Sequence, residues 1–555
     1  MLRQTVLVLA LTLATGAATA QTWSVEDRKL PEMGSSAAQL LTPAKRVEYG
    51  SMMLAQMRHY NLVLDDPMLD RWLSGTGANL GKHSARPADS FRFFLLRDRQ
   101  INAFATLGGY IGVNSGLVLA AQNEDEVASV LGHEVAHVTQ DHVLRSVERS
   151  QRDQLPVLLA MLGAIAAAQA GGNSSGNAAM AIMTGAMGLA QQRQINYTRS
   201  GEQEADHIGM QTLIRSGYNA NAMAEFFATL QNRMRANSAN YYGEEPPEYL
   251  MTHPVTTNRI SDARALAQQY MADPAKLKTG APIGAGIGNT NSLLPSSLRV
   301  SSTAMAAATA AASASSGPRG GDFAFAKERL RVLSEEQPGS SLREYQAIEK
   351  RSALTDAQRY GKAVALMRAQ GGANIAQSME LLRGLAGVNA GNLWIRMAEA
   401  ESLSRSGQTG GGDAIYLQLL REYPGDRAVS LTYADSLTNR QNKASAQQAL
   451  QVLRPLEDKL PDDPMYWLSL ARAYQAAGDE VRAGLAFAEN AYVRGLTEQA
   501  LVQYETIKRR TDLDYYARAR ADARIAEIKP MVLELRRQGL EDPDLHGRKQ
   551  DPDGF

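Results

Sequence analysis

The chain has 555 residues, which is long enough for several domains. It carries 58 lysine plus arginine residues and 58 aspartate plus glutamate residues, and this zero net charge argues against a nucleic-acid or polyanion partner. Because there is no cysteine, disulfide bonds and lipid attachment to a cysteine are both excluded.

The first twenty residues have the pattern of a cleavable secretory signal peptide. Arg3 supplies a positive charge, residues 6–13 are apolar, and small residues occupy positions 18–20 before Gln21. We therefore expect a signal peptide over residues 1–20 and a mature chain from Gln21. In a bacterium, such a chain would act in the periplasm.

Two segments with strand composition follow, at residues 90–96 and 110–114. They are joined through residues 102–109, in which Gly108-Gly109 indicates a tight turn. An exposed edge strand can bind an extended polypeptide through its main chain, which would favour unfolded substrates. The alternative is an ordinary structural hairpin.

The segment from Asn123 to Val138 predicts an amphipathic helix, with Asn123 as N-cap and Glu126 in the first turn. This helix contains His133-Glu134-x-x-His137. Residues four apart lie on one helix face, so both histidines can reach one metal ion. Zinc held this way keeps a position for water, and Glu134 would act as general base. The alternative is a chance match on an exposed charged helix.

The third zinc ligand is expected further along the chain. In zinc peptidases with three histidine ligands, the third follows at the sixth position after the second, but Val143 stands there, so that type is excluded. His142 follows five residues after His137, which turns it off the metal-facing side. We interpret it as a surface residue or as one that supports a ligand from outside. A downstream carboxylate should be the third ligand.

Residues 199–210 supply that carboxylate. They are expected to be helical, and Glu202 and Asp206 stand four residues apart on one face. Glu202 could ligate zinc, and Asp206 could orient a ligand histidine. The alternative is an ordinary acidic first turn of a helix.

Two apolar stretches, residues 155–168 and 178–189, flank a glycine-rich segment. Each is shorter than the roughly 20 apolar residues that span a bilayer. We expect a helical hairpin that packs over the site or touches a membrane surface, with core packing as the alternative.

The second half of the chain has a different composition. Residues 276–321 are rich in Ala, Ser, Gly, Thr and Pro, which predicts a flexible linker that lets the two halves reorient. Residues 322–530 predict helix pairs of tetratricopeptide type that bind protein, with a plain helical bundle as the alternative. Residues 531–555 are expected to be a disordered tail.

The repeat prediction rests on equivalent positions in successive helices. Trp394, Ser430 and Trp467 are each followed four residues later by alanine, in the first helix of a pair. Tyr423-Pro424 and Leu460-Pro461 should end the second helices. The period exceeds the usual one, so loop insertions such as Gly410-Gly411-Gly412 are expected.

The motifs of the first half resemble those of the zinc metallopeptidases related to HtpX and the CAAX prenyl proteases, over residues 40–270. The segments that carry this resemblance are residues 101–105, Gly108-Gly109-Tyr110, His133 to His137, Glu202-x-x-x-Asp206, Thr252-His253-Pro254 and Arg259-Ile260. It implies a mostly α (α+β) fold, with a zincin-like metallopeptidase domain over residues 21–275 that contains a small sheet. The α-helical tetratricopeptide-type solenoid would follow.

The resemblance also implies roles for individual residues. One zinc ion per chain would be held by His133, His137 and Glu202, with Glu134 as base and Asp206 supporting a ligand. His253 would return to the site, where it would stabilise the oxyanion or occupy the fourth zinc position and hold the enzyme inactive. Without the resemblance, a histidine before proline would be only a turn residue.

This combination of signal peptide, peptidase and repeats is similar to the family of β-barrel assembly-enhancing proteases of the Gram-negative periplasm. That similarity implies unfolded or misfolded outer-membrane proteins as substrates, and the barrel assembly machinery as the partner of the repeats. The long linker departs from the family pattern. The competing hypothesis is a repeat-based adaptor or chaperone whose zinc site is structural or latched by His253.

Overall fold

The computed structural model describes residues 41–146, 148–149, 198–239, 249, 253–273 and 321–537. The predicted signal peptide, the two apolar stretches, the linker up to residue 320 and the tail from residue 538 lie outside these residues. Among the described helices, none is both long enough and apolar enough to cross a bilayer.

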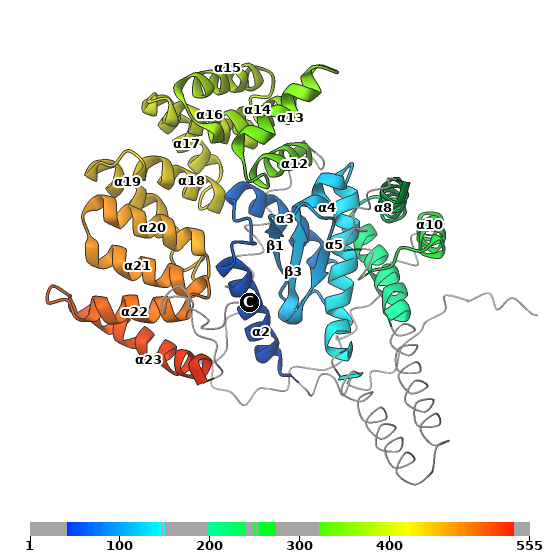
Figure 1. Cartoon of the computed structure of the whole chain (residues 1–555), viewed down its shortest axis with the longest axis horizontal. Helices are drawn as coiled ribbons and strands as arrows, with labels where there is room; N and C mark the ends of the chain where they lie inside the picture. The colour runs from blue at the N-terminus through cyan, green and yellow to red at the C-terminus, as the bar shows by residue number, and fades with distance from the viewer. Residues whose placement is uncertain are drawn as a thin grey trace, which may run out of the picture.

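A small sheet forms the centre of the first half (Figure 1). Its strands are β1 (Arg92–Leu96), β2 (Ala103–Ala105) and β3 (Tyr110–Asn114), in the order β1-β3-β2. β1 is parallel to β3, with Phe94 opposite Gly112, whereas β2 is antiparallel to β3. The two predicted strands are therefore confirmed. β1 and β3 do not form a hairpin with each other, because they are parallel and β2 lies between them in the chain. Whether the sheet edge binds substrate or is purely structural stays a prediction.

The predicted tight turn before β3 is confirmed. Gly108 and Gly109 have φ values of 73° and 80°, in the left-handed region that favours glycine. A Cβ at Gly109 would lie 2.0 Å from the carbonyl oxygen of Ser90, so the space also requires glycine.

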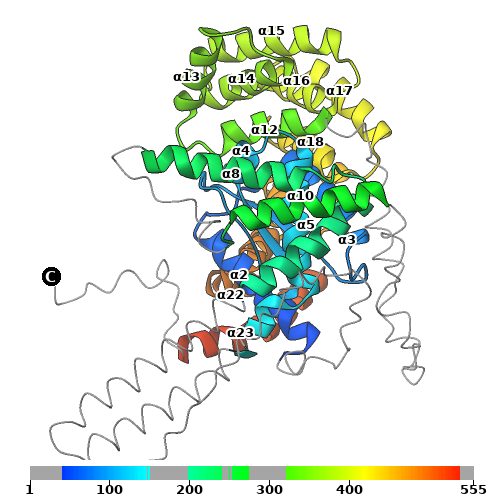
Figure 2. The same cartoon turned by 90° about the vertical axis from the view of Figure 1, so that its right-hand side faces the viewer.

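Alternate residues of β1 pack against different helices, as the pleat of a strand requires. Leu95 belongs to the main core, which also contains Leu73 of α3 and Leu131 of α5. Phe94 and Leu96 instead pack with Leu54 of α2. The helices of this half are α2 (Pro43–His59), α3 (Pro67–Lys82), α4 (Ser115–Ala120), α5 (Glu124–Thr139), a helix over residues 198–215, α8 (Ala222–Ala239) and α10 (Thr257–Ala272). Figure 2 shows α8 and α10 running side by side, and Figure 1 shows them on the side of α5 away from the sheet.

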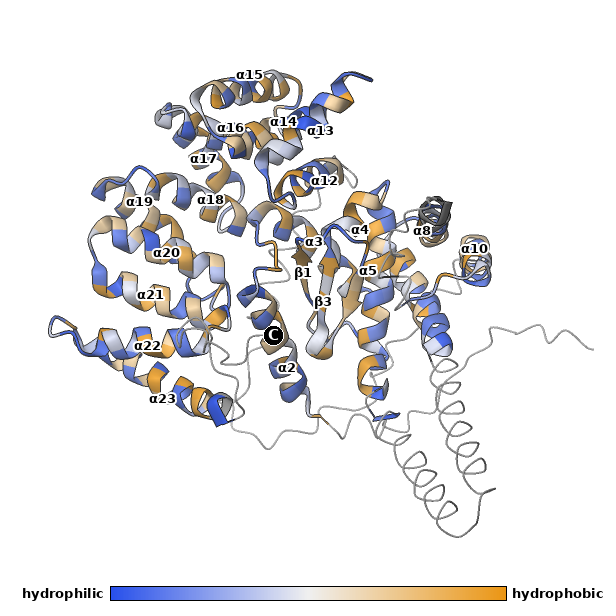
Figure 3. Ribbon diagram, in the orientation of Figure 1, coloured by the Kyte–Doolittle hydropathy of each residue, from blue (hydrophilic) through white to orange (hydrophobic). Residues whose placement is uncertain are grey.

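The second half is a curved array of helices in which each packs against the next (Figure 1). Its elements are α12 (Gly321–Leu333), α13 (Pro338–Glu349), α14 (Asp356–Ala369), α15 (Gly372–Val388), α16 (Leu393–Arg405), α17 (Thr409–Glu422), α18 (Arg427–Thr438), α19 (Lys443–Leu453), the short 3-10 helix η4 (Arg454–Leu456), α20 (Pro464–Ala477), α21 (Glu480–Val493), α22 (Thr497–Lys508) and α23 (Tyr515–Arg537). Figure 3 shows apolar residues alternating with polar ones along these helices, as expected where one face of each is buried. The mostly helical fold with a small sheet is confirmed.

The predicted repeat positions lie in the first helices of successive pairs. Ala398, Ala434 and Ala471 are buried in α16, α18 and α20. Small alanine side chains at these places let neighbouring helices approach closely. The end of α17 is as predicted, since Tyr423 is its C-cap.

Three boundaries differ from the sequence-based expectation. Gly410-Gly411-Gly412 lies in the first turns of α17 and is no loop insertion, because Gly412 packs on the carbonyl of Ala400 in α16. The second helix before Pro461 ends at Leu453, earlier than expected, and the 3-10 helix η4 follows it directly. The tail begins later than residue 531, because α23 runs to Arg537 and buries Val532.

The two halves share a surface. The rings of Trp72 and Phe323 lie 6.0 Å apart, and the guanidinium of Arg329 donates to both carboxylate oxygens of Asp66 at 2.8 and 2.7 Å. Buried residues of both halves form one continuous core. These contacts contradict the expectation that the linker lets the two halves reorient. Separating the halves would expose apolar surface and leave a buried charge unpaired.

Candidate metal centre

Helix α5 carries the first part of the site. As predicted, the side chain of its N-cap Asn123 accepts a hydrogen bond from the backbone of Glu126. The carboxylate of Glu126 accepts in turn from the backbone of Gln122. His133 and Glu134 are each 1% exposed, so this helix buries its motif and the alternative of an exposed charged helix is wrong.

The helix over residues 198–215 crosses α5 at close range. A Cβ at Gly132 would lie 3.2 Å from the carbonyl oxygen of Gly209, and one at Gly209 would lie 2.9 Å from the Cα of His133. This approach brings Glu202 and Asp206 to the histidines. Glu202 lies 3.5 Å from both His133 Nε2 and His137 Nε2.

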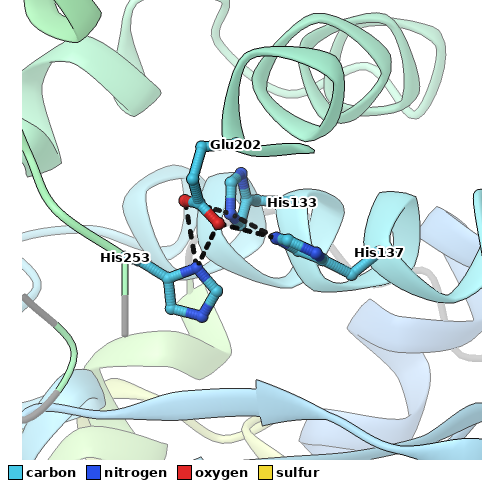
Figure 4. A group of neighbouring side chains, drawn as sticks. All are labelled: His133, His137, Glu202 and His253. Carbon is cyan, nitrogen blue, oxygen red and sulfur yellow. Dashed lines mark hydrogen bonds and ion pairs between the residues drawn. The ribbon is translucent and has the colours of Figure 1, made fainter. Parts of the chain in front are cut away.

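His253 completes a cluster of four side chains (Figure 4). Its Nδ1 lies 3.0 Å from both carboxylate oxygens of Glu202, and the Nε2 atoms of His133 and His137 lie 3.0 Å apart. One ligand atom from each of these four residues lies within 4.8 Å of the others. A single metal ion can therefore contact all four.

Glu134 stands beside this cluster without belonging to it. Its Oε1 lies 3.7 Å from His253 Nε2 and has no hydrogen-bond partner among the described residues. Buried polar atoms are normally hydrogen-bonded, so an unpaired carboxylate oxygen fits a place where a water or substrate binds.

Asp206 lies behind His133. Its Oδ1 is 3.0 Å from His133 Nδ1, which places the carboxylate on the outer nitrogen of a candidate ligand. The guanidinium of Arg259 donates to both oxygens of Asp206 at 2.7 Å, and its Nη1 lies 2.9 Å from Glu202. One buried arginine therefore connects both acidic residues of the helix over residues 198–215.

Comparison with known proteins agrees with a metallopeptidase site. Residues 67–267 match the model of Peptidase family M48. These residues are therefore similar to the peptidases of this family. The metalloendopeptidase class that the motifs predicted is thereby confirmed for these residues.

Several relatives match different lengths of the chain. A β-barrel assembly-enhancing protease of Yersinia pestis is 29% identical over 90% of this chain and 91% of its own. The β-barrel assembly-enhancing protease of Escherichia coli K12 is 38% identical, over 43% of this chain and 47% of its own. A mitochondrial metalloendopeptidase of Saccharomyces cerevisiae is 26% identical over 29% of this chain and 42% of its own. The chain thus spans about half the length of several relatives, and the suspected resemblance is confirmed.

The electrostatics around the four side chains suit a cation at this cluster. Burial lowers the pKa of His133, but hydrogen bonds to Asp206 and Glu202 outweigh it and raise the pKa to about 10. Burial also raises the pKa of Glu202, but hydrogen bonds from His133 and His253 hold it far below its usual value. Burial and the neighbouring charge of His133 lower the pKa of His137. Metal binding here would release the proton of His133.

The donor set fits zinc. Imidazole nitrogens and a carboxylate oxygen in a buried cluster are the ligands that zinc prefers, and three of them leave a position for reaction. The four candidate ligand atoms converge on one point.

Of the two interpretations of His142, the surface one is wrong and the one that places it behind a ligand agrees with the structure: its side chain is 8% exposed and its Nδ1 lies 2.8 Å from His137 Nδ1. Two other residues have positions near the site that the sequence did not predict. The ring of Tyr249 lies against His253, with centroids 4.8 Å apart and the planes tilted by 31°. Arg259 had a signal, because a basic residue in the first turn of a helix opposes the helix dipole and so suggests a carboxylate partner elsewhere.

Proposed function

We propose that this protein is a periplasmic zinc endopeptidase that cleaves unfolded or misassembled outer-membrane proteins and assists their assembly. The observation that carries this proposal is the convergence of four ligand atoms within 4.8 Å beside the buried carboxylate of Glu134. The printed names of the Yersinia and E. coli relatives support the substrate class.

In this proposal His133, His137 and Glu202 hold the zinc ion, and Asp206 orients His133 through its Nδ1. Bound zinc supplies a Lewis acid that activates water near neutral pH. The carboxylate of Glu134 takes the proton of the attacking water and hands it to the leaving nitrogen. Because Glu134 is 1% exposed, bulk water does not compete for that proton.

His253 supports two roles. Its Nδ1 faces Glu202 at 3.0 Å, which suits a fourth ligand that holds the enzyme inactive. Its Nε2 lies 3.7 Å from Glu134, the proposed base, which suits a donor to the oxyanion. The ring of Tyr249 lies against His253 with centroids 4.8 Å apart.

Extended, unfolded segments are the proposed substrates. β2 is an edge strand of the sheet and packs beside α5, which carries His133 and His137. A polypeptide that added to this edge would have its main chain hydrogen-bonded to β2, whatever its sequence. This mode suits a quality-control enzyme, because only unfolded chains offer a free strand.

The helical array is the proposed partner-binding half, over residues 322–530, with tetratricopeptide-type pairs that dock the outer-membrane barrel assembly machinery. Stacked helix pairs form a curved surface, and such surfaces bind other proteins. The signal peptide over residues 1–20 supports periplasmic action. The peptidase half would cover residues 21–275.

Casein cleavage by wild type and Glu134→Gln tests the enzymatic proposal. Both proteins should bind one zinc ion per chain by metal analysis, since Glu134 is no ligand, but only wild type should cleave. A chelator should stop the cleavage. Cleavage by Glu134→Gln at the wild-type rate would show that Glu134 is not the general base.

The second candidate function is a repeat-based adaptor or chaperone with a latched or structural zinc site. It is favoured by the position of His253 within the ligand cluster. His253→Ala separates the two roles of this residue. Increased basal cleavage would support the latch, whereas lost cleavage with retained zinc would support the oxyanion role. If neither wild type nor His253→Ala cleaves while both hold zinc, the adaptor function stands.

A further inference from the structure

His142 is a buried imidazole that touches the candidate ligands from outside. Its Nδ1 lies 2.8 Å from Nδ1 of His137, and its Nε2 lies 3.1 Å from Oε2 of Glu204. Glu204 stands between Glu202 and Asp206 in sequence, yet it is absent from the ligand cluster. These three side chains form a row that leads away from the site.

The proton positions along this row follow from His137, given the proposed zinc site. Its Nε2 faces the cluster, 3.0 Å from His133 Nε2, so Nε2 is the nitrogen that would ligate. The outer Nδ1 of a ligating histidine carries the proton. His137 Nδ1 therefore donates to His142 Nδ1, and His142 Nε2 carries a proton that it donates to Glu204.

We propose that His142 is a positioning residue for His137, and that it transmits the negative charge of Glu204 to this ligand. It fixes the tautomer and the ring orientation of His137. The two helical ligands are then supported differently. His133 meets the carboxylate of Asp206 directly at 3.0 Å, whereas His137 reaches Glu204 only through an imidazole.

The turn after α5 explains why the helical spacing does not predict this contact. The helix ends at Thr139, and Asp141 has a φ of 52°, in the left-handed region, which turns the chain back toward the site. The carboxylate of Asp141 is held by two arginines from distant segments. Arg46 contacts it at 2.9 Å, and Arg86 contacts it at 3.1 and 3.3 Å.

The far end of the row is also held. Arg145 Nη2 lies 3.2 Å from Oε2 of Glu204, and its Nε donates to the carbonyl of Gln140 at 2.7 Å. A Cβ at Gly201 would lie 3.8 Å from the His142 ring, so the helix over residues 198–215 packs on that ring at ordinary contact distance. The His142 ring is therefore held by contacts at both nitrogens and by the packing of this helix against it.

Zinc affinity of the purified full chain tests the inference, measured by competition with a chromophoric chelator. Losing an outer partner of a metal-ligating histidine typically weakens metal binding about 10- to 100-fold. His142→Leu should show that loss. His142→Asn should recover most of it, because its amide oxygen can accept from His137 Nδ1. Glu204→Gln should also lose affinity, but less than His142→Leu, because it keeps the acceptor on His142 and loses only the charge.

Two further measurements separate positioning from simple destabilisation. His83→Leu removes another histidine of the same domain, whose Nδ1 lies 2.8 Å from the carbonyl of Asn79, and it should leave zinc affinity unchanged. The absorption spectrum of the cobalt-substituted protein should change in His142→Leu and return toward wild type in His142→Asn. If His142→Leu does not fold, Glu204→Gln and His142→Asn still decide the question.

The outcomes distinguish this inference from the proposed function on which it rests. If wild type binds no zinc, the proposed function fails. If wild type binds zinc and His142→Leu or Glu204→Gln binds it with the same affinity and cobalt spectrum, only the role of His142 is overturned. Equal loss in His142→Leu and His142→Asn would also overturn it, since the hydrogen-bond acceptor would then not matter.

Discussion

Gly209 packs directly against the backbone of His133, so closely that a Cβ on Gly209 would lie 2.9 Å from the His133 Cα. This contact sets the distance between α5 and the helix over residues 198–215. It therefore decides whether Glu202 can reach the two histidines of α5. The candidate metal centre therefore depends on a glycine that is not one of its proposed ligands.

Gly209→Ala is expected to push the two helices apart. Overpacking of a tight contact typically costs about 1–3 kcal/mol, and the added shift should weaken zinc binding as well. The measurement is urea unfolding with and without zinc. Gly384→Ala is the control, because a Cβ at this helical position in α15 meets nothing within 4 Å and should be neutral or slightly stabilising. Equal effects of the two variants would contradict the argument.

Arg259→Met is expected to destabilise the protein. It removes the bidentate partner of Asp206 and the 2.9 Å contact with Glu202, which leaves two buried carboxylates with only histidine partners. Breaking such a buried pair typically costs about 3–5 kcal/mol. Thermal unfolding of the zinc-free protein measures it.

Arg359→Gln is the matched control for Arg259→Met. Its partner is Asp356, and both side chains are more than a third exposed. An exposed ion pair contributes only about 0–1 kcal/mol. A loss for Arg259→Met no larger than that for Arg359→Gln would show that the buried arginine is not needed for charge balance.

Asp70 lies where the two halves meet, in contact with Arg427, and its ionisation should make the free energy of unfolding depend on pH. Burial raises the pKa of Asp70 to about 7, although Arg427 at 3.0 Å lowers it in part. A carboxyl with a raised pKa in the folded state contributes stability that is present below its unfolded pKa of 3.8 and is lost as the pH rises to about 7.

Asp70→Asn should therefore gain stability relative to wild type as the pH rises from about 4 to about 7, by at least about 1 kcal/mol. Arg427 keeps Asp463 as a partner in this variant. Urea unfolding of both proteins at pH 4, 5.5 and 8 measures the difference. A difference that stays constant over this range would mean that Asp70 ionises normally.

Gly412→Ala should destabilise the helical array. Its Cβ would lie 2.5 Å from Ser404 Oγ and 2.8 Å from the carbonyl oxygen of Ala400, so α16 and α17 would have to separate. We expect a loss of about 1–3 kcal/mol in chemical unfolding. Gly410→Ala in the same helix meets nothing within 4 Å and should cost nothing. A harmless Gly412→Ala would show that this helix contact can relax.

Much of the site was predictable because helix geometry is local. His133 and His137 share a face at a spacing of four residues, as do Glu202 and Asp206, whatever the rest of the chain does. The strands at residues 90–96 and 110–114 were predictable from composition, but their parallel pairing was not, because it requires the short strand β2 between them, antiparallel to β3.

The sequence by itself determined the local elements and the residue types of the metal centre. Only the tertiary structure decided that Arg259 bridges Glu202 and Asp206, that His142 returns to His137, and that the two halves pack together. Each of these contacts joins segments that are brought together by packing, or by a left-handed turn that distant arginines hold. Their free energy depends on burial of charge and apolar surface, which no local spacing encodes.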